Sequence, residues 1–198
     1  MSLERDIDAI DWHPDAEGKG QYLLSFLESC EDVLPSLRRR TKDVLADHGI
    51  EDIDPESYYP IDEIAASFEN IVDSIGETTM RRGGEQMGLD IPFPSTVDDP
   101  HAALESLNDL HQQACRLPPG TNATGSRASD PAGRYEYERI DETTARVAIT
   151  DRYPFPAPMA EGVAKGVVNR FGDSNSYVRI EAVDTNPSER AAWKVSWM

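Results

Sequence analysis

The sequence of 198 residues is poor in cysteine and has no long apolar run. Its two cysteines, Cys30 and Cys115, are too few and too far apart for a disulfide framework or a cysteine-based zinc site. We predict that both are small apolar helix residues. No run of about eighteen apolar residues occurs, and the charged start MSLERDIDAI is unlike a signal peptide. We therefore expect a soluble, cytoplasmic protein with no membrane segment.

Basic side chains are also scarce. Nineteen lysines and arginines face 37 acidic residues, which gives a formal net charge of −18. This excess of negative charge argues against nucleic acid or an anionic membrane as an electrostatic partner. Only four of the basic residues are lysines, and an acidic surface poor in lysine is typical of proteins that work in concentrated salt, where self-repulsion is screened. We expect a halophilic source; the alternative is an ordinary acidic protein.

Catalytic and metal-binding motifs are missing from the sequence. The four histidines are His13, His48, His101 and His111, and none has the spacing to a second histidine and a glutamate that a helical zinc site needs. There is no glycine-rich phosphate loop and no nucleophile elbow. Acidic residues are so abundant that pairs of carboxylates arise by chance. The sequence thus predicts no catalytic residue and no metal site, and it favours a non-enzymatic protein.

The first half of the chain has the pattern of a helical layer. Apolar residues at helical spacing predict five helices, at residues 20–34, 37–49, 61–75, 77–87 and 100–116. The strongest pattern, 61–75, includes Phe68 and stops at Gly76. Met87 closes the next helix, as core or as an adaptable pocket wall. His111 falls on the apolar face of the last helix. It is either a histidine bonded to a backbone carbonyl at the edge of the core or a haem or metal ligand.

The second half of the chain has the pattern of a sheet. Residues 117–133 are rich in glycine and proline and predict an exposed loop. Alternating apolar residues then predict four strands and one inserted helix, with the strands at residues 134–140, 144–150, 176–183 and 193–197. We expect an α+β fold in which a helical N-terminal half packs on a C-terminal antiparallel sheet of about four strands. Residues 1–19 are predicted to be a poorly ordered acidic arm, and 20–198 a single domain.

The segment 151–171 is the centre of this arrangement. Its prolines keep Tyr153 and Phe155 on a stiff, extended stretch. Gly162 and Gly166 then share one face of a helix and permit close approach to another backbone. Opposite this segment we expect the helix 61–75 and the helix that carries His111. With Tyr135 in the first strand, these residues build either a core or an apolar ligand pocket.

A series of short motifs, in chain order, gives a resemblance to a known family. They are SYYP, SIG, MRRGGEQMG, ALESLNDLH, YEYE, RYPFPAPMAEGVAKGVVNRF and WKVSW. This order resembles the 4-vinyl-reductase-like domain family, in the ligand-binding superfamily shared with haem nitric-oxide-binding domains and vesicle-tethering subunits. The likeness runs from about Gly20 to Met198. It implies helices packed on an antiparallel sheet, a cavity between them for a hydrophobic small molecule, and regulation or sensing more often than catalysis.

The resemblance also bears on cofactors. Metal-binding members place a cysteine after the tyrosine-proline step, where this chain has Phe155, so the resemblance does not imply a cysteine-ligated metal. The haem-binding branch places its axial histidine on a helix, and His111 matches that position. The same branch has a tyrosine-serine-arginine clamp for the haem propionates on a later strand, which Tyr135, Tyr137 and Arg139 do not reproduce.

The functional hypothesis from the sequence is a small-molecule-binding or sensor domain, expected as a homodimer. Its apolar ligand would be enclosed by a set of residues from both halves of the chain: Phe68, Met87, His111, Tyr135, Tyr153, Phe155 and Gly162. The cofactor is open, with haem as one alternative. Three different functions stay open beside this hypothesis: a haem or gas sensor ligated by His111, a structural adaptor that binds a regulatory protein partner without a ligand, and an enzyme acting on a tetrapyrrole side chain. For that enzyme the sequence offers no donor site for reducing equivalents.

Overall fold

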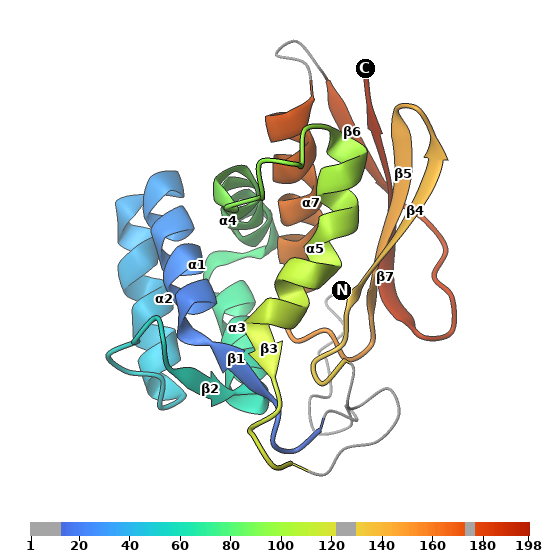
Figure 1. Cartoon of the computed structure of the whole chain (residues 1–198). Coiled ribbons are helices and arrows are strands. Elements are labelled where there is room, and N and C mark those ends of the chain that lie inside the picture. The colour runs from blue at the N-terminus through green and yellow to red at the C-terminus, as the bar shows by residue number, and fades with distance from the viewer. Residues whose placement is uncertain (1–12, 122–129, 173–176) are drawn as a thin grey trace.

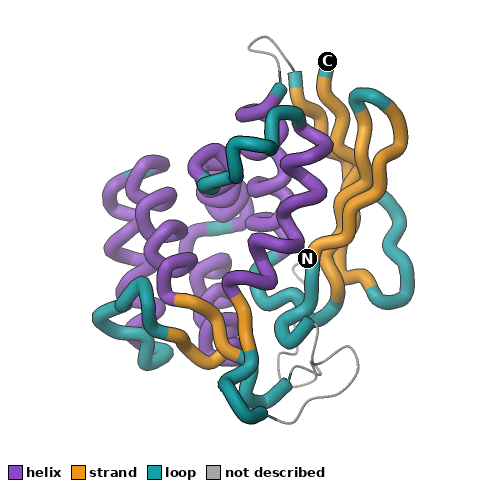
Figure 2. The backbone as a smooth tube through the Cα atoms, in the orientation of Figure 1, coloured by secondary structure: helices purple, strands orange, loops and turns teal. Residues whose placement is uncertain are grey.

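The computed structural model describes residues 13–121, 130–172 and 177–198. Parts of three predictions lie outside these ranges: residues 1–12 of the arm, 122–129 of the loop and Ser176 of a strand. In the described residues, six helices form a layered mass against one face of a four-stranded sheet (Figure 1), and a small second sheet lies at the foot of the helical part (Figure 2). The predicted α+β architecture is confirmed.

The helical half begins with a pair of helices and continues with three more. Their bounds are α1 (Gly20–Val33), α2 (Pro35–Asp47), α3 (Ile61–Ile75), α4 (Glu77–Asp90) and α5 (Pro100–Ala114). Gly76 ends α3 with φ of 81°, a left-handed conformation that favours glycine. Asp99 caps α5, since its Oδ1 accepts the backbone N–H of His101 at 2.7 Å and of Ala102 at 3.0 Å. All five predicted helices are confirmed, and their ends differ by a few residues.

A three-stranded antiparallel sheet was not predicted. It consists of β1 (Glu17–Lys19), β2 (Tyr58–Pro60) and β3 (Cys115–Arg116), in the order β2-β1-β3. Strands of two or three residues are too short to give an alternating pattern in the sequence. The end of the predicted arm is therefore a strand, and Cys115 lies in a strand, where we had expected a helix. Both cysteines are buried and unpaired, as predicted.

The main sheet has four antiparallel strands, as expected. They are β4 (Tyr135–Asp141), β5 (Thr144–Thr150), β6 (Val178–Ala182) and β7 (Glu189–Trp197), in the order β4-β5-β7-β6. The helix α7 (Ala157–Phe171) connects β5 to β6. One sheet face is buried against α5 and α7 (Figure 1), while the other carries a charged row in register across the strands: Glu138, Arg146, Lys194 and Glu181.

The helices α4 and α7 pack with their backbones almost in contact. A Cβ atom added to Gly162 or Gly166 would fall on the carbonyl oxygen of Arg81 or Glu85 in α4. The predicted close approach of the glycine helix is therefore confirmed, and its partner is α4, which the sequence did not indicate. The two expected neighbours, α3 and α5, face the proline part of the same segment through Phe68 and His111. The helices of the described residues include none long and apolar enough to span a membrane.

Candidate functional site

The segment between β5 and α7 lies where the helices meet the sheet. Pro154 and Pro156 have no N–H group, so this stretch cannot join a sheet as an ordinary strand. A turn fixes its start, where the Tyr153 N–H donates to the Thr150 carbonyl at 3.0 Å. The side chains of Tyr153 and Phe155 are 3% and 6% exposed. The prolines thus deliver two aromatic rings into the space between the layers.

These two rings join a continuous group of rings that we name the interlayer cluster: Phe26, Phe68, His111, Tyr135, Tyr153 and Phe155. Ring centroids lie 4.8 Å apart for Phe26 and Phe68, and 5.1 Å apart for Phe68 and Phe155. The imidazole of His111 lies 4.8 Å from the ring of Tyr153, which is 4.9 Å from that of Tyr135. Segments from α1, α3, α5, β4 and the β5–α7 connection therefore converge on one buried cluster.

Five of the seven residues that the sequence predicted for a ligand site belong to this cluster. The other two, Gly162 and Met87, have no ring and are not part of the cluster. Gly162 packs on the α4 backbone, and Met87, which is 8% exposed, is itself part of α4. The prediction missed Phe26. Its position in the apolar face of α1 was visible in the sequence, but its partner, Phe68, lies in another helix.

The hydroxyl side of the cluster is polar but uncharged. Tyr153 Oη donates to Tyr135 Oη at 2.7 Å. Nearby, Tyr22 Oη donates to the carbonyl of Leu110 in α5 at 2.7 Å. Burial raises the pKa of Tyr22 to about 12 and moves the pKa of Tyr135 and of Tyr153 upward as well. All three phenols are therefore neutral at physiological pH.

The imidazole of His111 is buried and neutral. Its Nε2 lies 3.1 Å from the carbonyl oxygen of Ala132, which can only accept, so Nε2 carries the proton. Burial lowers the pKa of His111 to about 4, although backbone hydrogen bonding and the carboxylate of Asp130 oppose this shift. The structure thus confirms the prediction of a histidine bonded to a backbone carbonyl.

A second histidine of α5 also bonds a backbone carbonyl, a contact that was not predicted. His101 Nε2 lies 3.1 Å from the carbonyl of Glu142 in the β4–β5 turn, and Tyr137 Oη lies 2.8 Å from His101 Nδ1. Because the carbonyl accepts from Nε2, Nδ1 accepts from the tyrosine. These partners lie 41 and 36 positions away in the sequence, beyond the reach of any local pattern. Both ends of α5 are thus anchored to the C-terminal half.

The described part of the chain has no cluster of acidic, cysteine and histidine side chains suited to a metal ion. In the ranges 13–121, 130–172 and 177–198, no three histidine, cysteine, aspartate or glutamate side chains gather at a place that could hold a metal ion. The chemistry of the cluster is that of one neutral nitrogen donor, hydroxyl groups and apolar rings. Such a surface suits a ligand that is mostly apolar and is oriented by a few polar contacts.

No family model matches the chain, and no curated protein matches it. Solved structures do. An oxygen-binding H-NOX domain related to soluble guanylate cyclases, in its oxygen complex, is similar with a TM-score of 0.61 at 16% identity, covering 90% of this chain and 94% of that one. A second structure, described as "Structural insights into the molecular mechanism of H-NOX activation", has a TM-score of 0.59 at 13% identity, covering 90% and 96%.

A third similar structure is described as "Modulating Heme Redox Potential Through Protein-Induced Porphyrin Distortion". Its TM-score is 0.57 at 16% identity, with 90% of this chain and 99% of that chain covered. At these identities the likeness shows the fold alone: this chain has the H-NOX fold. The fold that the sequence motifs implied is thus confirmed, while membership of the 4-vinyl-reductase-like family is not.

Proposed function

We propose that this chain is a small-molecule sensor domain with its ligand site at the interlayer cluster, and that haem held through His111 is the ligand this site supports best. One observation carries the proposal. His111, a buried neutral imidazole, faces the Tyr153–Phe155 segment from α5 in a fold shared with H-NOX domains. The printed names of those similar proteins speak of oxygen binding and of haem, and here they serve as support only.

The donor set of the cluster fits a haem. A neutral imidazole is the form of histidine that binds metal ions, and aromatic rings suit a porphyrin plane. His111 would supply a nitrogen ligand to the iron, with Phe68, Tyr153 and Phe155 as apolar walls. Nε2 now donates to Ala132, so coordination at this nitrogen would replace one hydrogen bond, worth about 1 kcal/mol net. When bound, a haem would supply iron that takes up a diatomic gas.

This chain departs from the haem-binding pattern in its contacts to the propionates. Tyr135, one of the residues that do not reproduce the clamp, instead accepts a hydrogen bond from Tyr153. We therefore expect haem to be held mainly by His111 and by apolar contact, and more weakly than a clamp would hold it.

A sensing role agrees with the place of the cluster between layers. His111 belongs to α5, Phe68 to α3, and Tyr153 and Phe155 to the connection between β5 and α7. A ligand that separates these rings must change how the three elements pack. Ligand binding would thus be converted into a change of shape, which a partner protein could read.

The second candidate is a sensor of an apolar molecule without metal. The observation that favours it is the hydrogen bond that occupies His111 Nε2. In that case the same rings enclose the ligand and His111 remains bonded to Ala132.

Other expectations from the sequence stay predictions. They are the homodimer, the protein partner, the adaptor role, the cytoplasmic location and the halophilic source.

Titration of the purified protein with hemin tests both candidates. We expect a Soret band that saturates at one hemin per chain, a further shift of this band when the reduced protein meets carbon monoxide, and loss of the band's His-ligated form in His111→Ala. His48→Ala is the matched control, because His48 ends α2 and bonds Asn70 away from the cluster. No saturable band in the wild-type protein rules out haem.

Native mass spectrometry of protein purified from its own host addresses the second candidate. A retained apolar molecule that is lost when Phe155→Ala alters the cluster would support a metal-free sensor. If neither hemin nor any retained molecule binds, the sensor proposal itself fails.

A further inference from the structure

Arg190 of β7 reaches the backbone of the segment that carries Tyr153 and Phe155. Both residues precede a proline, and the prolines provide no N–H for sheet pairing. Arg190 Nη1 lies 3.1 Å from the Phe155 carbonyl oxygen and 3.4 Å from that of Tyr153. One guanidinium thus holds the backbone of the two residues whose rings enter the interlayer cluster.

A β-bulge places Arg190 for this contact. On β5 and β7, Ile149 pairs with Ala191 but Thr150 pairs with Glu189, so Arg190 has no partner across the ladder. Bulges of this kind re-aim a side chain. Arg190 reaches the segment, while its neighbour Glu189 bonds Arg146 of β5.

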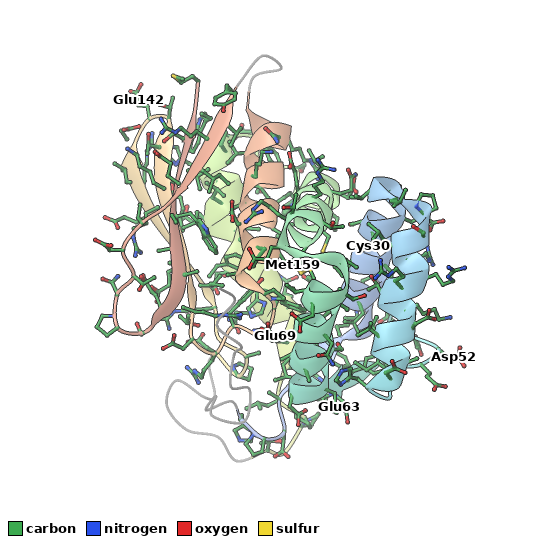
Figure 3. All side chains as sticks on the ribbon, turned by 180° about the vertical axis from the view of Figure 1, so that it is seen from behind. Cys30, Asp52, Glu63, Glu69, Glu142 and Met159 are labelled. Atoms are coloured by element: carbon green, nitrogen blue, oxygen red, sulfur yellow. The ribbon has the colours of Figure 1, made fainter. Side chains whose placement is uncertain are left out.

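The same guanidinium also reaches the helical layer. Arg190 Nη2 donates to Glu69 Oε1 at 3.0 Å, and Glu69 is the residue after Phe68 on α3, on the side of the helix towards the sheet (Figure 3). The ring of Phe68 in turn contacts that of Phe155. Consequently α3 and the segment are joined twice, once by rings inside the cluster and once through Arg190 at its border.

We propose that Arg190 is the positioning residue of the ligand site: it sets where Tyr153 and Phe155 stand for the ligand and couples their displacement to α3. This proposal rests on the proposed function for its ligand. A ligand that enters between Phe68 and Phe155 moves the segment relative to α3, and the guanidinium then loses or re-forms its bonds. Arginine suits this role because its planar fork meets several acceptors at once, which a lysine ammonium on a flexible stem does not.

The test compares two conservative substitutions. Arg190→Lys removes the fork, and Arg146→Lys is the matched control, since Arg146 also pairs with a glutamate and its side chain is similarly exposed, at 19% against 20% for Arg190. With hemin as the probe, we expect Arg190→Lys to weaken binding about tenfold, as loss of a charge-assisted hydrogen bond would. We expect Arg146→Lys to change it less than about twofold. Equal effects of the two substitutions would overturn the proposal.

A measurement without ligand separates this proposal from the proposed function. The aromatic NMR signals of Tyr153, Phe155 and His111 report the position of the segment directly. We expect Arg190→Lys to shift them, Glu69→Gln to shift them less because the carbonyl bonds remain, and Arg146→Lys to leave them in place. If hemin fails to bind but these shifts occur, Arg190 keeps its positioning role and only the ligand is wrong. Unchanged signals in Arg190→Lys would refute that role.

Discussion

At the scale of single residues, His111 is an ionisable side chain that lies almost wholly inside the protein. It is 4% exposed, and this burial disfavours its charged form. Its hydrogen bond to Ala132 satisfies one ring nitrogen, while the rings of Tyr153, Tyr135 and Phe155 lie around it. The protein therefore holds a neutral imidazole in an apolar site, and protonation of this imidazole would destabilise the folded state.

We predict that the free energy of unfolding depends on pH through His111. The folded-state pKa of about 4 lies below the unfolded value of 6.5, so the unfolded chain takes up a proton first as the pH falls. The stability that this site contributes is fully present above pH 6.5 and is lost between pH 6.5 and 4, by roughly 3 kcal/mol at 1.36 kcal/mol per pKa unit. Urea unfolding at a series of pH values measures it.

The control for this prediction is a pair of glutamine variants. His111→Gln keeps an N–H donor for the Ala132 carbonyl but does not titrate, so its stability should vary less between pH 6.5 and 4 than that of the wild-type protein. His48→Gln removes a histidine that lies outside the cluster and should keep the wild-type slope. A wild-type slope in His111→Gln would show that other groups cause the pH dependence.

At the scale of elements, the backbones of α4 and α7 pack so closely that a Cβ at Gly166 of α7 would meet a backbone carbonyl of α4. We predict that Gly166→Ala destabilises the protein by about 2 kcal/mol or more, because the new Cβ meets the backbone of Glu85 and the helices must separate. In a helix without such a contact, alanine is more stable than glycine by about 1 kcal/mol. A loss of stability in Gly166→Ala would therefore support the backbone contact, and a gain would contradict it. Thermal or urea unfolding measures it.

Gly83→Ala is the matched control for this prediction. Gly83 also lies in α4, but a Cβ there meets side chains and no backbone: the ring edge of Phe26 at 3.2 Å and Cys30 Sγ at 3.9 Å. A side chain can yield by a few tenths of an ångström where a backbone cannot, so we expect a change within about 1 kcal/mol. Equal losses in the two variants would contradict the picture of a backbone contact.

The helices and strands also show which parts of the fold could be predicted from the sequence. Helices of thirteen to fifteen residues and strands of five to nine bury one face and therefore show a period, which located α3, α5, α7 and the main sheet. Five of the six rings of the cluster were predicted, because the prolines fix Tyr153 and Phe155 and the helical period places Phe68 and His111. What stayed hidden depends on pairing over long distances: the small sheet, the partner of the glycines, and Arg190, whose role follows from a bulge.

At the scale of the whole molecule, the net charge of −18 opposes compaction. We predict that the melting temperature rises as KCl increases from about 0.1 M to about 2 M, because the Debye length falls from about 10 Å to below about 3 Å and repulsion among the carboxylates is screened. Differential scanning calorimetry measures it. Sucrose at matched osmolality is the control, since it does not screen charge. An equal rise in sucrose would show that exclusion of the cosolute, and not screening, is responsible.

The anchoring of α5 has a consequence for the order of folding. His101, His111 and Gln112 bond the carbonyls of Glu142, Ala132 and Gly133, partners that are synthesised later than the helix itself. Until the β4–β5 hairpin forms, the two imidazoles on α5 lack these carbonyl acceptors, and the helix is not yet held in its final place. A growing chain released after α5 would thus carry its first five helices without the contacts that the hairpin and α7 supply, and the native helical layer would form only after both have been synthesised.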